Sequence, residues 1–386
     1  EWTERERKSK KKEKNEKKDQ KPRASVTLAI KEDDVLPDLK LSLTKLSDKA
    51  IEDEITPEIL LNMLQDGQFV SKIAASLLDL YKAKSKKYRS LFTKLRHSIK
   101  TDEAQIESLG KNIPKDVVKE MFPLVDTNKI FKEQLKKFID RIDLFIKQIT
   151  PASQLQIKAN LITAISDRDN GILSITGDNR AFIRNKLARI IFSLSRGYQP
   201  FLDSFMNIAI TGPAGVGKTK LAKCIGFVYG KSGILLRGDL IVLSPSDMIG
   251  QYIGHTAPKT VGNLLKGLEN VILIDEAYQI MPCQNGLIAD TKSFGPESIT
   301  EIVNFLDKYM GLSVMLIAGY KREIDGCFFA ANQGLPRRFP YRWELPTYSS
   351  FELFNIFLNE VSKRLNKQIF GKEIALYIYA LVSQLN

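Results

Sequence analysis

At 386 residues with 43% hydrophobic content, the chain is long enough for two or three domains and for a substantial core. The excess behind the formal net charge of +13 is concentrated in the tail: residues 1–23 hold 11 basic against 6 acidic side chains, residues 24–168 hold 24 against 21, and the remainder holds 23 against 18. No folded part is strongly basic as a whole, and no apolar run reaches the roughly 18 residues of a membrane helix or resembles a signal core, so we expect a soluble protein with no membrane partner.

The three cysteines, Cys224, Cys283 and Cys327, lie far apart and match no CxxC or metal-binding spacing. We therefore expect neither a disulfide framework nor a zinc site, and a reducing, cytoplasmic location. The sequence begins at Glu1 without a methionine, so we read it as a fragment or a processed form.

Residues 1–23 form a lysine-rich tail with almost no apolar side chains after Trp2. Such a segment cannot offset its ordering entropy by burial, which predicts disorder. Its run KSKKKEK is compatible with a solvating tail, a nuclear-targeting signal or a phosphate-binding patch.

Residues 24–168 have a mostly helical pattern, which predicts a helical N-terminal domain that serves as an adaptor or partner-binding region. Thr56 and Pro57 are typical of an N-cap and a first-turn proline, and Gly67 of a helix end. Apolar side chains recur at helical spacing in two stripes, one over residues 70–95 and one over residues 131–149. Each helix needs a partner to bury its stripe, so the sequence predicts a small bundle.

Charge is unevenly placed within this region. Residues 72–100 carry nine Lys and Arg side chains against Asp79 alone, whereas residues 31–66 are acidic. Either the two segments lie against one another, or the basic helix contacts nucleic acid or an acidic partner.

After residue 169 the pattern changes to short apolar runs that alternate with helical segments. The runs are residues 206–211, 240–244, 271–275, 313–319 and 341–345. Five strands separated by helix-length spacers predict an α/β fold with a five-stranded parallel sheet, in which ligands bind at the carboxyl ends of the strands.

The first of these strands is followed by the P-loop sequence GxxxxGK[ST] and a helical pattern. The predicted nucleotide-binding residues are Gly212, Pro213, Ala214, Gly215, Val216, Gly217, Lys218, Thr219 and Lys220. Glycines let the backbone wrap a phosphate, Lys218 reaches the β and γ oxygens, and the Thr219 hydroxyl suits Mg²⁺. ATP and Mg²⁺ are therefore the expected cofactors.

Further along, VILIDEA places Asp275 and Glu276 at the end of a buried strand, where carboxylates are costly without a partner or a function. Asp275 suits the Mg²⁺ shell, and Glu276 suits the catalytic base that orients the attacking water. The sequence therefore predicts an enzyme that hydrolyses ATP.

With these motifs, the stretches TGPAGVGKT, VILIDEAY, LIAGY and GQYIGHTAPKT resemble the AAA+ ATPases of the group that includes stage V sporulation protein K and the red-type (CbbX-like) Rubisco activases. The resemblance covers residues 176–350 and implies a P-loop NTPase domain over residues 169–346. It also implies that a helical lid begins at residue 347, of which residues 347–386 form only a part.

The resemblance adds two elements that the motifs alone do not give. Arg338 in GLPRRFPY matches the family's arginine finger, a catalytic cation inserted into the neighbouring subunit's site, with Arg337 as the alternative. A finger of this kind implies a homo-hexameric ring. Tyr252, Ile253 and Gly254 match the aromatic-aliphatic-glycine pore loop, although Tyr252 packing within its own domain is the alternative.

Two features depart from the family pattern. Gly319, Tyr320 and Lys321 stand where many members have a sensor 1 Asn or Thr, and no sensor 2 arginine is identified.

The first functional hypothesis is a Mg-ATP-driven remodeller that threads an unknown protein client. The second is a nucleic-acid motor or loader that uses the basic segment 72–100, and a nucleotide-dependent scaffold with little turnover is a third.

Overall fold

The computed structural model describes residues 54–109, 113–114, 117–118, 121–250, 252, 254–281, 283–289 and 294–365. The predictions for the tail at residues 1–23, for residues 24–53 and for the lid beyond residue 365 lie outside these described residues. The described residues from Ile55 onward belong to one compact unit, which has the architecture given below. No helix among the described residues is both long and apolar enough to cross a membrane.

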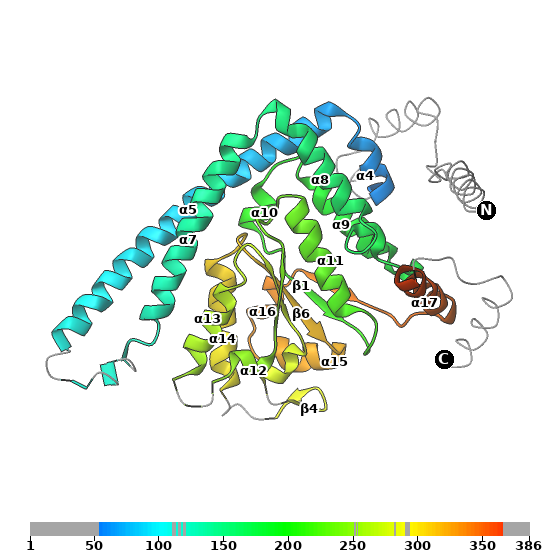
Figure 1. Ribbon diagram of the computed structural model, residues 1–386. Helices are drawn as coiled ribbons and strands as arrows, with labels where there is room; N and C mark the ends of the chain where they lie inside the picture. The colour runs from blue at the N-terminus through cyan, green and yellow to red at the C-terminus, as the bar shows by residue number, and fades with distance from the viewer. Residues whose placement is uncertain are drawn as a thin grey trace, which may run out of the picture. The chain divides into compact units, whose positions relative to one another are not determined.

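A five-stranded parallel sheet forms the centre of this unit, in the order β2-β3-β6-β1-β7 (Figure 1). Its strands are β1 (Ile208–Thr211), β2 (Leu240–Leu243), β3 (Val271–Ile274), β6 (Val314–Gly319) and β7 (Tyr341–Glu344). Every residue of β1, β3 and β6 is buried, as expected for central strands covered on both faces. The predicted strands and their parallel arrangement are confirmed.

Helices and short helical turns connect and cover the strands. They are α9 (Ala181–Ser193), α10 (Gln199–Asp203), α11 (Lys218–Lys231), α12 (Pro245–Met248), α13 (Thr256–Leu265), α14 (Gly295–Lys308), α15 (Lys321–Glu323), α16 (Leu335–Arg338) and α17 (Ser350–Leu365), with 3₁₀ turns η1 (Pro151–Ser153), η2 (Ile172–Ser174), η3 (Asp178–Arg180) and η4 (Ala277–Ile280) and a π-helical turn η5 (Ile324–Phe329). α11 packs on β2, β3 and β6, while α13 and α14 pack on each other.

The N-terminal part of the described chain is helical, as predicted. It comprises α4 (Pro57–Met63), α5 (Gly67–Leu109), α7 (Val125–Gln148) and α8 (Gln154–Ser166). Thr56 caps α4, because its hydroxyl accepts a hydrogen bond from the Ile59 amide at 3.3 Å, and Pro57 is the first helical residue. Gly67 does not end this helix: α4 stops at Met63, and Gly67 is instead the first residue of α5.

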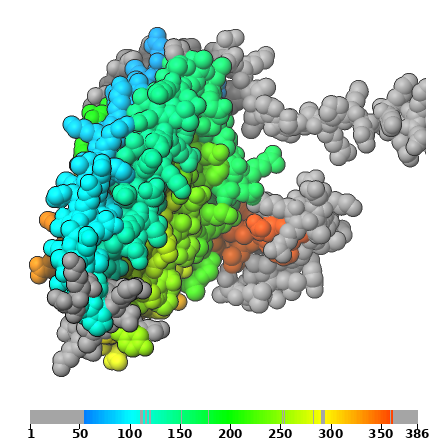
Figure 2. Space-filling model, turned by 60° about the vertical axis from the view of Figure 1, so that its left-hand side comes forward, coloured from blue at the N-terminus to red at the C-terminus, as the bar shows by residue number. Residues whose placement is uncertain are grey.

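α5 and α7 run side by side along one face of the molecule (Figures 1 and 2). The apolar stripe predicted for residues 131–149 supplies buried side chains to this contact, among them Phe131, Leu135, Phe138 and Ile142. In the first stripe, the buried side chains are Val70, Ile73, Ala74, Leu77, Tyr81 and Tyr88. Leu78, Leu91, Phe92 and Leu95 are only partly covered. The helical layer, formed by α4, α5, α7 and α8, also contacts the domain that contains the sheet, so the two belong to one compact unit.

A buried polar cluster joins α5 to the sheet domain. The Lys84 ammonium, with no exposed surface, donates to the two carboxylate oxygens of Glu269 at 2.8 and 3.1 Å and to the Ile234 carbonyl at 2.8 Å. Tyr88 and the Leu236 amide donate to the same carboxylate at 2.6 and 2.9 Å. Every Glu269 oxygen therefore has a partner, which a buried charge requires.

The expectation that the cysteines form no disulfide is wrong for Cys283 and Cys327, which are bonded to each other. Cys283 begins a small hairpin of β4 (Cys283–Gln284) and β5 (Leu287–Ile288), and this hairpin lies against η5, which carries Cys327. Sequence spacing cannot reveal a pairing made by this tertiary contact. Cys224 is a free, buried thiol.

Candidate active site

The predicted phosphate loop connects β1 to α11. Gly217 immediately precedes α11 with φ +87°, a left-handed conformation that favours glycine over any residue with a side chain. The Gly212 amide donates to the carbonyl of Gly319 at 3.2 Å, which fixes the start of the loop to the end of β6. The loop therefore has the strand-loop-helix setting that its sequence predicts.

Lys218 is held inside this loop. Its ammonium donates to the carbonyls of Gly212 and Pro213 at 2.9 and 2.8 Å, and the side chain is largely buried. Thr219 and Lys220, the next residues of α11, are exposed. The lysine charge thus lies at the centre of a turn whose glycines and helix N-terminus suit a phosphate group.

The predicted acidic pair follows β3 directly, and both side chains are half-buried. Glu276 has φ +50°, an unusual backbone conformation for a residue other than glycine and one that costs about 1 kcal/mol or more. Its Oε2 atom is buried and has no hydrogen-bond partner among the described residues. A buried carboxylate oxygen without a protein partner is suited to accept a hydrogen bond from a bound ligand or water.

The strand order explains why these motifs meet. β6 lies between β3 and β1, so the phosphate loop, the acidic pair and Tyr320 all follow the carboxyl ends of three adjacent strands. The Tyr320 ring lies 5.5 Å from the Lys218 ammonium and 6.3 Å from the ring of Tyr278. Burial, with a hydrogen bond to Glu276, raises the pKa of Tyr278 to about 12.

Two further residues, which sequence reasoning missed, lie beside the loop. The Arg180 guanidinium is 3.7 Å from the ring centre of Tyr348 and donates to the carbonyls of Val216 and Pro346 at 3.2 and 3.1 Å. Its Nη1 atom is buried without a hydrogen-bond partner among the described residues. Both residues line a small pocket that also includes Ile175. Neither position carries a motif, so only the fold identifies them.

The two candidate finger arginines differ sharply. Arg338 is 4% exposed and forms a two-fold ion pair with Asp307, with Nε at 2.8 Å from Oδ1, and a bond to the Gly334 carbonyl. Arg337 is exposed. In this structure Arg338 is therefore bonded within its own chain, and Arg337 is the one of the two that is exposed to solvent.

Tyr252 lies in the segment between α12 and α13, and 66% of its surface is exposed. Its ring makes an edge contact with His255 at 5.6 Å. Gly254 has φ +81° and open space around its α-carbon, while Ile253 lies outside the described residues. The structure does not bury Tyr252 in its own domain, so the alternative interpretation of this residue is not supported.

Comparison with known proteins agrees with this geometry. Residues 208–328 match the family model described as "ATPase family associated with various cellular activities (AAA)". Over these residues the chain therefore matches an AAA ATPase domain. Its matched residues include the phosphate loop, the exposed Tyr252 and the acidic pair.

The relatives come from the group that the sequence resembles, and that resemblance is confirmed. Stage V sporulation protein K of Bacillus subtilis is 35% identical over 159 residues, 41% of this chain and 47% of the relative. Protein CfxQ of Xanthobacter flavus is 30% identical over 194 residues, covering 50% and 59% of the two chains. A chloroplastic cbbX homolog of Guillardia theta is 35% identical over 151 residues, 39% of each. The chain thus spans between 39% and 59% of the length of these relatives.

Proposed function

We propose that the protein hydrolyses Mg-ATP as a homo-hexameric ring and uses this reaction to remodel a protein client or thread it through the ring's pore. The observation that carries the proposal is the meeting of the phosphate loop and the Asp275–Glu276 pair at one edge of the sheet, with β6 between them. This edge is where parallel α/β sheets bind their ligands.

Each residue of the site has a role in this proposal. The loop amides and Lys218 bind the phosphates, and the small pocket beside the loop that Ile175, Arg180 and Tyr348 line would receive the base of the nucleotide. Thr219 and Asp275 would hold Mg²⁺, which would neutralise charge on the phosphate oxygens.

Glu276 positions the attacking water and accepts its proton, which suits a carboxylate whose buried Oε2 has no partner among the described residues. Tyr320, after β6 and near Lys218, takes the place of the missing sensor 1 residue. Its phenol can donate a hydrogen bond where other family members use an Asn or Thr.

Two features support the ring. Arg337 is exposed on α16, so we assign it the role of a finger that reaches the neighbouring subunit, in preference to Arg338. Tyr252 projects from the segment that the family resemblance assigns to the pore, where an exposed ring can grip a polypeptide of any sequence.

The nucleic-acid alternative has less support. Of the nine basic residues predicted to form its contact surface, Lys84 is buried against Glu269, and Lys87 donates to the Met310 carbonyl at 2.6 Å. At least two of these charges therefore serve the contact between α5 and the sheet domain. Because the other basic residues of this segment could still contact DNA, DNA is included in the assay as a comparison.

The test is ATP binding by calorimetry and hydrolysis by phosphate release, with unfolded protein and single-stranded DNA added separately. Lys218→Ala removes charge-assisted bonds of about 1.5–3 kcal/mol each, so ATP affinity should fall by about tenfold or more. Glu276→Gln should keep ATP affinity and lower kcat by about 100-fold or more. Absence of ATP binding by the unaltered protein in the presence of magnesium would refute the proposal, and stimulation by DNA alone would favour the nucleic-acid motor.

A further inference from the structure

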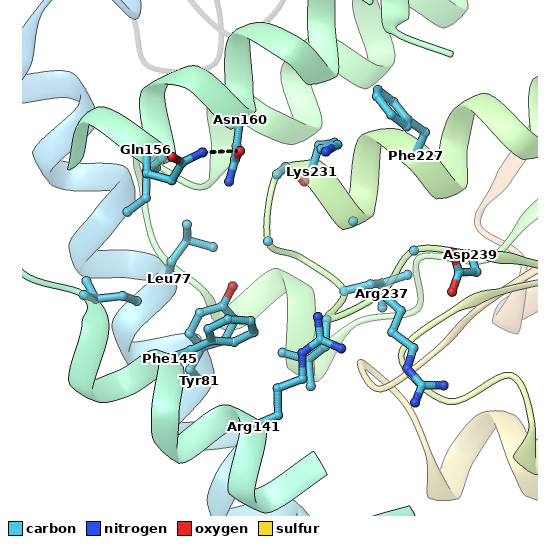
Figure 3. Close-up of a pocket in the computed structure, with 18 of the residues that line it drawn as sticks. Leu77, Tyr81, Arg141, Phe145, Gln156, Asn160, Phe227, Lys231, Arg237 and Asp239 are labelled. Carbon is cyan, nitrogen blue, oxygen red and sulfur yellow. Dashed lines mark hydrogen bonds between the residues drawn. The ribbon is translucent and has the colours of Figure 1, made fainter. Parts of the chain in front are cut away.

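A cleft of about 900 Å³ lies between the helical layer and the AAA domain, separate from the active-site residues. Residues of α5, α7 and α8 line one side, and α11 with the segment from residue 232 to residue 240 lines the other (Figure 3). Its volume is in the range of sites that bind ligands. None of the residues assigned to ATP, magnesium or the pore lines it.

On the α11 side of the cleft, two lysines flank a phenylalanine on one face of the helix. Lys223, Phe227 and Lys231 are spaced four residues apart, which places them on one face of the helix. Both lysines are exposed and Phe227 is partly exposed, and the Lys231 ammonium lies 5.6 Å from the Phe227 ring centre. This face therefore offers two positive charges on either side of an aromatic ring.

The opposite side has a similar composition. On α7, Arg141 lies 5.4 Å over the ring of Phe145, which in turn stacks on Tyr81 of α5 at 5.8 Å. Arg237, exposed just before β2, adds a third cation on the α11 side of the lining. The α11 side thus carries three cations and the opposite side carries Arg141, with apolar surface between them.

These four cations, Arg141, Lys223, Lys231 and Arg237, form no ion pair with another residue in the described part of the chain. Among the residues that the structure describes, Asp239 is the one acidic residue that lines the cleft. A ligand that fits must therefore bring negative charges to both sides of the cleft and hydrophobic groups to the apolar surface between them.

We propose that this cleft binds an acidic peptide segment of a partner protein, with carboxylates on the four cations and hydrophobic side chains against Phe145 and Phe227. The amides of Gln156 and Asn160 on α8, 2.9 Å apart, offer further donors and acceptors of the kind that a peptide backbone pairs with (Figure 3). The site does not depend on ATP hydrolysis, so it stands apart from the proposed function.

A peptide suits the cleft better than single-stranded nucleic acid. Nucleic-acid sites of this kind use aromatic rings with a free face on which bases stack. Tyr81 is buried and stacked on Phe145, while Phe145 and Phe227 each have a cation over the ring. The rings thus form an apolar surface for the side chains of a peptide and offer no free face on which bases could stack.

The test is fluorescence polarisation of a labelled peptide in which glutamates alternate with phenylalanine and leucine, added to the full chain without nucleotide. We expect saturable, micromolar binding that weakens with salt, and no binding of the matched peptide with lysines in place of glutamates. The charge reversal Lys223→Glu/Lys231→Glu should weaken binding by about tenfold or more. Phe227→Ser, at a partly exposed position, should weaken it several-fold.

The matched control is Lys86→Glu/Lys94→Glu, which makes the same charge change at the same eight-residue spacing on exposed positions of α5 outside the cleft. This control should change the affinity by less than about twofold. Circular dichroism checks that each variant is folded. Equal binding by the cleft variant and the control, or no peptide binding at all, overturns the proposal. Tighter binding of oligo-dT that the cleft variant abolishes assigns the cleft to nucleic acid instead.

Discussion

Replacement of Lys84 by methionine tests how the helical layer is attached to the AAA domain. The change keeps most of the length of the unbranched side chain but removes the charge that neutralises Glu269, whose side chain has no exposed surface. Glu269 would retain the Tyr88 hydroxyl and the Leu236 amide as donors, with no cation. Breaking a buried pair from one side costs about 3–5 kcal/mol, because it leaves an uncompensated charge.

The loss can be measured as a change in melting temperature. At about 2 cal/mol/K of unfolding entropy per residue, a unit the size of residues 55–386 loses about 4–7 °C for 3–5 kcal/mol. Thermal unfolding followed by circular dichroism resolves such a shift. Lys82→Met is the matched control on the same helix: Lys82 pairs with Asp79 at 3.3 Å, and both side chains are more than half exposed. That pair is worth less than about 1 kcal/mol, so the control should melt within about 1 °C of the unaltered protein.

A double-mutant cycle completes the test. Lys84→Met/Glu269→Gln removes both charges together, so the double variant should be more stable than the sum of the two single losses predicts, by about 1–3 kcal/mol. Additive losses, or a Lys84→Met variant as stable as Lys82→Met, would show that the cluster does not hold α5 to the AAA domain in solution.

Three further predictions concern the active site, the pore and alkaline pH. Arg337→Ala should lower kcat by about 10³-fold or more with ATP affinity retained, whereas Arg338→Ala should chiefly lower the melting temperature; the reverse pattern would return the finger to Arg338. Tyr252→Ala should abolish stimulation of the ATPase by an unfolded protein, and Tyr252→Phe should preserve it; equal stimulation of both variants counts against a pore role. Burial raises the pKa of Cys224 to about 12 and, with the nearby Glu269 carboxylate, the pKa of Tyr88 well above its usual 10.0. The unfolded chain therefore loses these protons first, and urea titrations should show the free energy of unfolding falling as the pH rises above about 9, by about 1.4 kcal/mol per pH unit for each group; a flat profile would contradict the burial of both groups.

The sheet and the phosphate loop could be predicted because their determinants are continuous in the sequence. A buried parallel strand is a short apolar run, and the P-loop is a contiguous motif that joins one such run to a helix. Asp275 and Glu276 were found in the same way, at the end of an apolar run. Strand order then follows from topology, which brings contiguous motifs from separate strands to the same edge.

The remaining features depend on contacts between distant segments, which spacing does not encode. Arg338 matched the family position in sequence, but its burial follows from Asp307 on α14, 31 residues earlier. The disulfide of Cys283 and Cys327 arises because a hairpin lies against η5. Arg180 contacts Val216 and Pro346 across 36 and 166 residues, and no local pattern marks such a residue as part of the site.

The position of α11 bears on whether the cleft and the nucleotide site are coupled. This helix begins at Lys218 and ends at Lys231, so it borders both. Two of its glycines contact the segment before β2 directly: a Cβ added at Gly226 would lie 2.5 Å from the Gly238 carbonyl oxygen, and one at Gly230 would lie 2.4 Å from that of Arg237. Backbone packed this closely leaves α11 no room to slide against the cleft wall that carries Arg237.

The cleft is therefore a preformed site, and a peptide bound there has little differential affinity for two positions of α11. A ligand without such a difference shifts no equilibrium, however tightly it binds. Because coupling is reciprocal, peptide affinity measured with and without ATP on the Glu276→Gln variant reports it in both directions. We expect the two affinities to agree within about twofold. A tenfold difference would mean that the contacts of Gly226 and Gly230 open when ATP binds, and α11 would then be the element that links the two sites.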